Sequence, residues 1–192
     1  MSLEEATLAY YKNPVKHRRH ATHPAIKAFT EPKIEWMVKQ IPEFHTKSLL
    51  NVCGGRGYWS NYMVKYCPNV HIIDMSLELI KLNSLPEDQK HLGSAYELPW
   101  NTNTFDVVLA PNLLHHLDHP VNAIRQYRTV ASKYVVIVEP VTNNFFMWLG
   151  CQYPYWEYGV KKYSAKFVKD LIKEAGGLEI VAETFIGGMS NN

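Results

Sequence analysis

The fold of this chain is decided by residues 49–57, which read LLNVCGGRG. An apolar run here ends abruptly in glycines, a pattern typical of a buried strand that enters a tight loop. Gly55 and Gly57 have no Cβ, so the backbone can turn sharply and approach a ligand closely. The next residues, Tyr58–Val64, can begin a helix. A strand, a glycine loop and a helix in this order are typical of nucleotide-like cofactor sites at the carboxyl end of a parallel sheet.

The rest of the sequence alternates between expected strands and expected helices. We predict strands over 48–53, 70–73, 89–92, 105–110, 134–138 and 178–186, and helices over 58–66, 76–83, 120–130 and 164–175. The run at 134–138, YVVIV, is continuous and β-branched, as expected for a strand buried on both faces. Strands alternating with helices predict a doubly wound α/β fold, with a mostly parallel sheet and helices on both faces.

Residues 1–44 are expected to form an N-terminal helical cap on this core, and the core spans residues 45–192 of a single domain. A short helix is expected from Glu4 to Tyr11. Pro32 is expected to open a second helix, with apolar residues at helical spacing, and Pro42 is expected to end it.

The composition excludes several classes of protein. Lys and Arg number 20 and Asp and Glu number 18, which gives no electrostatic case for nucleic acid as a partner. The three cysteines fit no zinc pattern and favour a reduced, cytoplasmic setting. His17, His20 and His23 lack the further ligand that would complete a metal site. The acidic N-terminus does not resemble a signal peptide, and no apolar window reaches the about 20 residues that span a bilayer. We expect a monomer or a homodimer without an integral membrane segment.

Asp74 ends the second expected strand. In that position it can accept hydrogen bonds from the two hydroxyls of a ribose. In nucleotide sites an acidic residue follows the glycine loop by about 20 residues. Asp74 follows Gly57 at nearly this spacing. The alternative role is an N-cap for the helix expected at 76–83, which Asp also favours.

Two later segments read GSAYELPW at 93–100 and TFDVVLAPNLLHHL at 104–117. They resemble, in order, motifs of the class I S-adenosylmethionine-dependent methyltransferases: Gly-Asp-Ala-x-x-Leu-Pro-Phe, Ser-Phe-Asp-Val-Val and Asn-x-Leu-His-His-Leu. The closest resemblance is to the type 11 group, which acts on small molecules and lipids. It runs from about Ser48 to Pro140 and continues weakly through Ala175–Leu178. It implies a Rossmann-like methyltransferase fold, S-adenosylmethionine as cofactor, and a small-molecule or lipid-like methyl acceptor.

The resemblance also implies a role for each motif residue. The loop from Cys53 to Gly57 would pass under the methionine part of the cofactor, Asp74 would hold the ribose and Met75 would pack on the adenine. The other expected cofactor residues are Asn51, Gly54 and Gly55 at the loop, Ser94, Ala95 and Tyr96 beside the adenine, and Ala110, Pro111 and Asn112 near the sulfonium. His115 would lie near the transferred methyl, either as a general base or as a packing and capping residue. The chemistry requires no metal.

Three positions depart from the family motifs. Asn51 stands where an acid usually ends the first strand, Cys53 replaces the first loop glycine, and Ser94 replaces the Asp that reads the adenine amino group. Asn51 and Ser94 can still hydrogen-bond but carry no charge, so we expect weakened cofactor binding. The backbone at Cys53 is expected to avoid positive φ. Only residues 187–192 follow the sixth expected strand, too few for the last antiparallel strand of the family sheet. Three explanations are open: this strand is missing, the sequence is truncated, or a second chain covers the edge of the sheet.

The acceptor side is expected at residues 143–159, where seven of seventeen residues are aromatic. The expected contacts of an apolar or aromatic acceptor are Tyr11, Trp148, Tyr155 and Trp156. The aromatic segment can instead pack as a core helix. It can also make a peripheral contact with a membrane that holds a lipid acceptor, since Trp and Tyr favour interfaces.

Two other functions fit parts of the sequence. A nicotinamide-dependent oxidoreductase needs a third glycine where Ser60 stands, and no Tyr-x-x-x-Lys pair follows the fourth strand. A non-catalytic protein with a methyltransferase fold, which binds the cofactor or acts as a scaffold, is suggested by the altered Asn51, Cys53 and Ser94.

Overall fold

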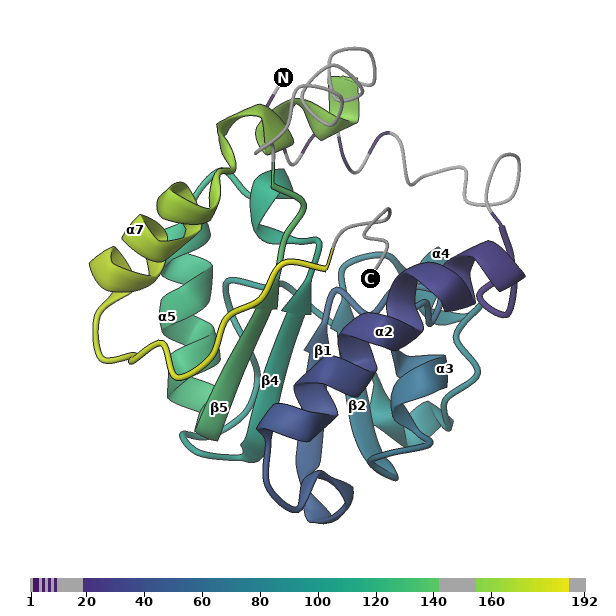
Figure 1. Cartoon of the computed structure of the whole chain (residues 1–192). Coiled ribbons are helices and arrows are strands. Elements are labelled where there is room, and N and C mark those ends of the chain that lie inside the picture. The colour runs from purple at the N-terminus through teal and green to yellow at the C-terminus, as the bar shows by residue number, and fades with distance from the viewer. Residues whose placement is uncertain are drawn as a thin grey trace.

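The computed structural model describes residues 2, 3, 5, 7, 9, 19–141 and 155–186, and for residues 155–158 only the backbone. Figure 1 shows the arrangement of the elements. The strands are β1 (Ser48–Val52), β2 (Asn69–Asp74), β3 (Lys90–Leu92), β4 (Phe105–Pro111) and β5 (Ala131–Val138). The α-helices are α2 (Pro24–Gln40), α3 (Ser60–Met63), α4 (Leu77–Ile80), α5 (Pro120–Val130) and α7 (Ala165–Ala175). The 3₁₀ helices are η1 (Phe44–Thr46), η2 (Glu87–Gln89), η3 (Leu114–His116) and η4 (Tyr155–Lys162).

The strands form one sheet in the order β3-β2-β1-β4-β5, and every pairing is parallel. The strand order reverses at β1, which pairs with β2 on one side and with β4 on the other. In sheets of this kind, ligands bind beyond the carboxyl ends of the strands at such a reversal. The glycine loop leaves β1 at that place, so the doubly wound α/β fold predicted from the sequence is confirmed.

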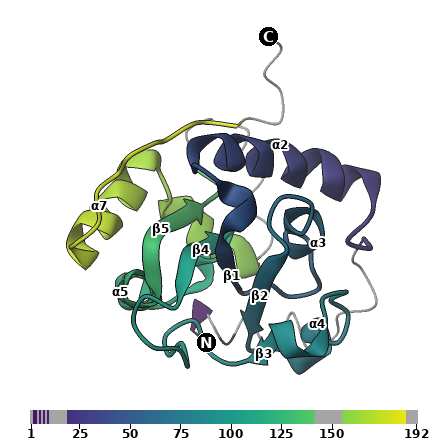
Figure 2. The ribbon, with the colours of Figure 1, turned by 90° about the horizontal axis from the view of Figure 1, so that it is seen from below.

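Alternating side chains place helices on both faces of the sheet (Figure 2). Leu49 and Val107 belong to the core cluster that includes residues of α2 and α3. Their neighbours Leu50 and Val108 belong to the other cluster, which includes residues of α5 and α7. β1 and β4 are therefore apolar on both faces, whereas β5, which was predicted to be buried on both faces, is only partly buried.

The core helices begin and end close to the predicted residues. α5 spans the predicted range, and Ser164 caps α7 by accepting a hydrogen bond from the Phe167 N–H (3.1 Å). Gly176 follows α7 with a φ of +71°, a conformation typical of a helix C-terminus. The helices α3 and α4 have only four residues each and are shorter than predicted.

The predicted start of the second N-terminal helix at Pro32 is wrong. α2 begins at Pro24, where the His23 side chain accepts a hydrogen bond from the Ala25 N–H (3.1 Å). This cap, together with a proline in the first turn, fixes the start eight residues earlier than the sequence suggested. Pro32 lies inside the helix, and the Lys33 ammonium donates to the Phe29 carbonyl in the same turn. Within the predicted first helix, residues 5, 7 and 9 are helical and the others lie outside the described part of the chain.

The predicted sixth strand over 178–186 is also wrong, because this segment has no regular structure. A strand requires a ladder partner, and within the described residues β5 is paired only with β4. The segment, coloured yellow in Figure 1, passes β5 without strand pairing. Ile180 and Val181 are adjacent and both exposed, at 44% and 75%, rather than alternating between a buried and a solvent face.

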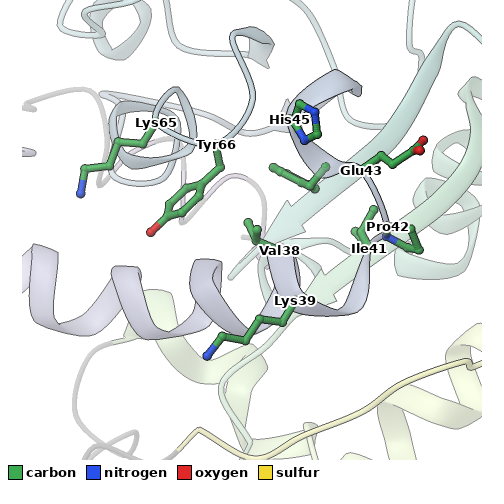
Figure 3. Close-up of a pocket in the computed structure, with 9 residues that line it drawn as sticks. Val38, Lys39, Ile41, Pro42, Glu43, His45, Lys65 and Tyr66 are labelled. Atoms are coloured by element: carbon green, nitrogen blue, oxygen red, sulfur yellow. The ribbon is translucent and has the colours of Figure 1, made fainter.

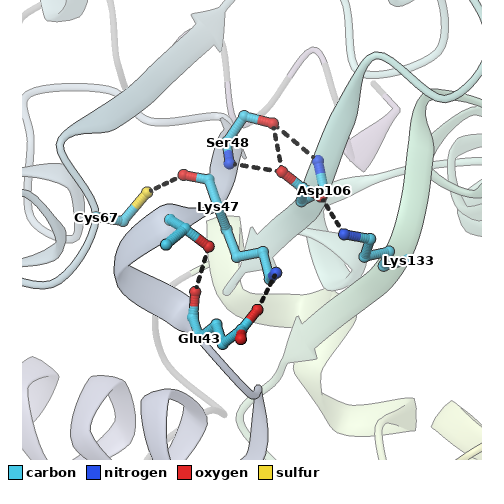
Figure 4. A network of polar contacts seen from close by, with 7 residues as sticks. Glu43, Lys47, Ser48, Cys67, Asp106 and Lys133 are labelled. Carbon is cyan, nitrogen blue, oxygen red and sulfur yellow. Dashed lines mark hydrogen bonds and ion pairs between the residues drawn. The ribbon is translucent and has the colours of Figure 1, made fainter.

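A polar network fixes the amino ends of the central strands (Figure 4). The Asp106 carboxylate accepts hydrogen bonds from the backbone N–H (2.9 Å) and hydroxyl (3.1 Å) of Ser48, and pairs with the Lys133 ammonium (2.9 Å). These bonds join β1, β4 and β5. The Ser48 backbone N–H, more than the other contacts, holds the pKa of Asp106 below its usual value. The network sets the strand register at the end of the sheet opposite the glycine loop.

Candidate functional site

A cavity of about 480 Å³ opens at the carboxyl ends of β1 to β4. The predicted cofactor and catalytic residues that line it are Asn51, Cys53, Gly54, Gly55, Asp74, Met75, Ser94, Ala95, Tyr96, Pro111, Asn112 and His115. Gly57 and Ala110 are the two predicted residues that are not among the lining residues. The structure therefore brings together, from four separate loops, the motif residues that the sequence singled out.

The glycine loop needs glycine at three neighbouring positions, for different reasons. A Cβ at Gly54 would lie 2.5 Å from Cγ2 of Ile72, so the loop packs directly on β2. Gly55 and Gly57 have φ values of +46° and +95°, which glycine adopts without strain. The Asn83 amide donates to the Gly55 carbonyl (3.0 Å) and supports the loop from outside. Asn83 follows the turn after α4, and no motif in the sequence marks it as a site residue.

Cys53 adopts a φ of +56°, so the expectation that its backbone avoids positive φ is wrong. A non-glycine residue in the left-handed region costs about 1–2 kcal/mol, and such strain is concentrated at functional sites. Cys53 therefore has the backbone conformation expected of the glycine that the family motif carries at this position. The tight loop imposes this conformation although Cys53 has a side chain. Burial, with the nearby Asp74 charge, raises the pKa of the Cys53 thiol well above its usual value, which makes the thiol a poor nucleophile.

Asp74 supports the glycine loop through its side chain. One carboxylate oxygen accepts from the Gly55 N–H (2.9 Å) and the other from the Ser76 N–H (2.9 Å). Ser76, not Asp74, is the N-cap of α4. Burial raises the pKa of Asp74, and the backbone hydrogen bonds oppose that shift only in part. A carboxylate held in a cavity wall at this energetic cost is suited to accept hydrogen bonds from a ligand.

Two further polar groups at the loop have unpaired atoms. Asn51 is 1% exposed, and both its amide nitrogen and its amide oxygen are buried without a partner. Arg56, which lies between two loop glycines, has one buried guanidinium nitrogen without a partner. Both side chains line the cavity. Because buried polar atoms are nearly always hydrogen-bonded, these atoms indicate a polar ligand at this wall.

The opposite wall comes from the segments after β3 and β4. The Ser94 hydroxyl accepts from the Tyr96 N–H (3.2 Å), and the Tyr96 hydroxyl accepts from the His119 N–H (3.1 Å). Asn112 turns the chain with a φ of +51° and donates its N–H to the Val138 carbonyl (2.6 Å). Met75 lines the cavity while 46% exposed, so it is available to cover a ligand at the rim.

His115 is paired with a residue that the sequence analysis missed. Its Nδ1 lies 2.5 Å from Oε2 of Glu139, and both side chains are only 2% exposed. The other oxygen of Glu139 accepts from the backbone N–H groups of Leu113 (2.9 Å) and Leu114 (2.7 Å). Glu139 directly follows β5, so the reasoning that selected Asp74, an acid at the carboxyl end of a strand, would also have found it.

The predicted acceptor residues are only partly described. Tyr11 and Trp148 lie outside the described residues, and for Tyr155 and Trp156 only the backbone of η4 is described. This helix contacts η3, because a Cβ at Gly159 would overlap the backbone carbonyl oxygen of His115. Val160, in the same helix, lines the cavity. The aromatic segment therefore ends against His115, as an acceptor-side wall would.

A second hollow, of about 520 Å³, lies between the end of α2, η1 and the turn after α3 (Figure 3). It is at the amino end of β1, opposite the glycine loop. None of the unpaired buried side-chain atoms found in the described part of the chain belongs to its lining. In those same parts of the chain, no three His, Cys, Asp or Glu residues are grouped to hold a metal ion, and no helix is long and apolar enough to cross a membrane.

Comparison with known sequences finds a family match over part of the core. Residues 50–137 match the family described as "Methyltransferase domain". An uncharacterized protein of Methanocaldococcus jannaschii is 33% identical over 94 residues. That match covers 48% of this chain and 41% of the relative, so the chain spans less than half of the relative's length.

Solved structures share the fold at low sequence identity. The match to a SAM-dependent methyltransferase from Aquifex aeolicus covers 92% of this chain and 88% of the Aquifex chain, with a TM-score of 0.63 and 17% identity. A SAM-dependent methyltransferase from Thermotoga maritima, described as a possible histamine N-methyltransferase, matches 92% and 80%, with a TM-score of 0.62 and 15% identity. The sheet order and helix placement are those of a Rossmann-like methyltransferase fold.

Proposed function

We propose that this chain, whose residues 50–137 belong to the methyltransferase domain family, transfers a methyl group from S-adenosylmethionine to a small-molecule or lipid-like acceptor. One observation carries the proposal: a single cavity joins the glycine loop, the buried Asp74 and the unpaired amide of Asn51. Fold likeness alone would not carry it, because one fold can host unrelated functions.

The residues present fit this cofactor. The two unpaired atoms of Asn51 can bond the amine and carboxylate of a methionyl group, and the unpaired nitrogen of Arg56 can bond its carboxylate. Asp74 would hold the ribose, since two hydroxyls can share a carboxylate that already accepts two backbone bonds. Met75 and Tyr96 would border the adenine. The neutral Asn51 and Ser94 in place of acids support the expectation of modest affinity.

The bound cofactor supplies a methyl group already activated on a sulfonium, so no covalent step is required of the protein. The contribution of this chain is to align the acceptor and exclude water. Leu113, Leu117 and Val160 supply apolar surface on the side of the cavity that holds His115. This lining supports an apolar or aromatic acceptor. The Thermotoga protein is described with an amine acceptor, which makes nitrogen an alternative acceptor atom to test.

Calorimetric titration with S-adenosylhomocysteine tests the cofactor part of the proposal. We expect saturable binding to the wild type and weaker binding to Asp74→Ala, with wild-type affinity in Asp170→Asn, an exposed carboxylate of α7. Absence of heat and of a thermal shift at millimolar ligand contradicts the proposal. Binding without methyl transfer to any fraction of a small-molecule and lipid extract favours the non-catalytic alternative that the strained Cys53 suggests.

A further inference from the structure

We infer that Asn83 is a positioning residue, which directs the Arg56 side chain at the carboxylate of the methionyl group by fixing the peptide bond between Gly55 and Arg56. The inference rests on the proposed function and goes beyond it, because it assigns a role in cofactor recognition to a residue that does not line the cavity. Asn83 would act on the ligand only through the glycine loop.

The glycine loop has few backbone donors left for an anionic ligand. The N–H groups of its glycines already donate within the protein: that of Gly54 to the Ile73 carbonyl (3.3 Å), that of Gly55 to the Asp74 carboxylate (2.9 Å) and that of Gly57 to the Gly54 carbonyl (3.0 Å). The guanidinium of Arg56 lines the cavity and has a buried nitrogen without a partner. It is therefore the charged donor that this loop can offer to a carboxylate.

Two side chains hold Gly55 on either side of its Cα. The Asp74 carboxylate accepts from the Gly55 N–H (2.9 Å), and the Asn83 amide donates to the Gly55 carbonyl (3.0 Å). Gly55 has a φ of +46° and no side chain to restrain it, so both neighbouring peptides can rotate easily without these bonds. The Gly55 carbonyl belongs to the peptide that leads into Arg56. The bond from Asn83 therefore fixes the direction in which Arg56 leaves the loop.

The orientation of the Asn83 amide follows from its partners. Its oxygen accepts from the Leu85 N–H (3.1 Å), which can only donate, and its nitrogen faces the Gly55 carbonyl, which can only accept. The nitrogen also donates to the Ser60 hydroxyl at the start of α3 (3.1 Å). Asn83 is only 4% exposed, so a buried amide with both ends bonded connects the loop, α3 and the turn after α4.

The other explanation of Asn83 is local: its oxygen orders residues 83–85 as an Asx turn, and the bond to the loop adds only stability. Asn83→Asp separates the two roles. A carboxylate keeps the acceptor for the Leu85 N–H but has no hydrogen to donate to the Gly55 carbonyl. The Lys90 ammonium, which donates to the Asn83 backbone carbonyl (3.3 Å), offsets part of the cost of the new charge.

Two further variants complete the set. Asn83→Ala removes the bonds to the turn and to the loop together, without a new charge, and replaces Asn83→Asp should that variant not fold. Ser60→Ala is the matched control: it removes another partner of the same amide at a fully buried position but leaves the bond to Gly55 in place.

Amide hydrogen exchange in the protein without ligand, followed by NMR relative to the amides of β1, tests whether Asn83 holds the loop. The Gly55 N–H reports on the loop because its own partner, Asp74, is unaltered. It should exchange about 3- to 10-fold faster in Asn83→Asp, as expected for the loss of one hydrogen bond, and at the wild-type rate in Ser60→Ala. The Leu85 N–H should exchange faster only in Asn83→Ala. Unchanged exchange of Gly55 in both Asn83 variants overturns the inference.

Titration calorimetry with S-adenosylhomocysteine and with 5′-deoxy-5′-methylthioadenosine, which lacks the amino-acid end, tests the effect on recognition. Asn83→Asp and Arg56→Gln should each raise the Kd of S-adenosylhomocysteine by at least about 10-fold, and that of methylthioadenosine by less than about threefold. The double variant should bind no more weakly than Arg56→Gln alone, because both changes remove the same contact. Ser60→Ala should keep the wild-type ratio of the two Kd values.

Equal losses of affinity for both ligands in Asn83→Asp, or additive losses in the double variant, overturn the inference, since a purely structural role would produce them. The same holds if Ser60→Ala changes the ratio of the two Kd values as much as Asn83→Asp does. Absence of S-adenosylhomocysteine binding in the wild type contradicts the proposed function. The exchange of Gly55 then still decides whether Asn83 positions the loop.

Discussion

Replacing Asp74 with asparagine should weaken cofactor binding while the protein stays folded. The carboxylate is 6% exposed and already accepts backbone bonds from Gly55 and Ser76. Hydrogen bonds to a charged group contribute about 1.5–3 kcal/mol and neutral ones about 0.5–1.5 kcal/mol, so two ribose bonds should lose about 1 kcal/mol each. A total of about 2 kcal/mol corresponds to an increase in Kd of about 30-fold.

The stability should respond differently. Burial raises the pKa of Asp74 in the folded protein. A carboxyl with a raised folded-state pKa contributes stability below its unfolded pKa, and that contribution is lost as the pH rises through the folded value. Above that folded value the ionised Asp74 is a cost, which a neutral amide removes. The amide has only one oxygen, however, so either the Gly55 or the Ser76 N–H loses its acceptor, and the free energy of unfolding should fall by about 1–3 kcal/mol.

Titration calorimetry with S-adenosylhomocysteine across acidic and neutral pH, combined with urea unfolding, checks both parts. In the wild type, the affinity should fall as the pH falls through the raised pKa of Asp74, because the protonated carboxyl loses its charge. In Asp74→Asn this part of the pH dependence should be absent. An affinity within threefold of the wild type at neutral pH would refute the role of Asp74 in holding the ribose. Loss of the cooperative unfolding transition would refute the stability argument.

Three further predictions concern strain, packing and charge. Cys53→Gly should change the free energy of unfolding by less than about 1 kcal/mol. The β-branched Cys53→Val should lower it by about 2 kcal/mol or more, because the position has a positive φ. Urea unfolding of both variants checks this, and equal stabilities of the two variants would count against strain at Cys53. Gly159→Ala should lower the melting temperature more than Gly176→Ala. A Cβ at Gly159 overlaps a backbone oxygen, whereas at Gly176 no atom lies within 4 Å and the substitution meets only the strain of a φ of +71°. The reverse order in calorimetric scans would show that η4 does not rest on the loop. Asp106→Asn should lower the free energy of unfolding by about 1 kcal/mol at neutral pH and by little at low pH. The reason is that a carboxyl with a lowered folded-state pKa contributes stability that is lost as the pH falls through that pKa. A loss of stability that does not depend on pH would contradict the ionic role of Asp106.

The parts of the fold that follow from local pattern could be predicted from the sequence. The strands β1, β2, β4 and β5 consist mainly of apolar residues, and such short runs have few alternatives in an alternating α/β chain, although β5 is only partly buried. Asp74 and the glycine loop were found because their residue types are required by backbone geometry and hydrogen bonding at the end of a strand.

The errors occurred where structure depends on a distant partner. The segment 178–186 contains strand-forming residues, but whether it forms a strand depends on a neighbouring ladder and not on its own sequence. Pro32 was a reasonable first-turn residue until the stronger cap at His23 placed the start of α2 elsewhere. Glu139 follows the end of β5 and could have been selected as Asp74 was, but its pairing with His115 arises only because the loop after β4 turns back to β5.

The walls of the cavity contain several features that would be unfavourable in a protein without a ligand there. Cys53 is held at positive φ, the Asp74 carboxyl is desolvated, which raises its pKa, and the Asn51 amide is buried without partners. An unpaired buried polar group alone costs about 1–3 kcal/mol. A ligand that bonds Asn51 and Asp74 removes part of this cost only in the folded state, so binding and stability must be linked. The gain in melting temperature on addition of S-adenosylhomocysteine should therefore be smaller in Asn51→Leu than in the wild type, although the variant without ligand should be at least as stable. If the two proteins gain equally, Asn51 does not contact the ligand, and its unpaired amide must be explained by a feature outside this cavity.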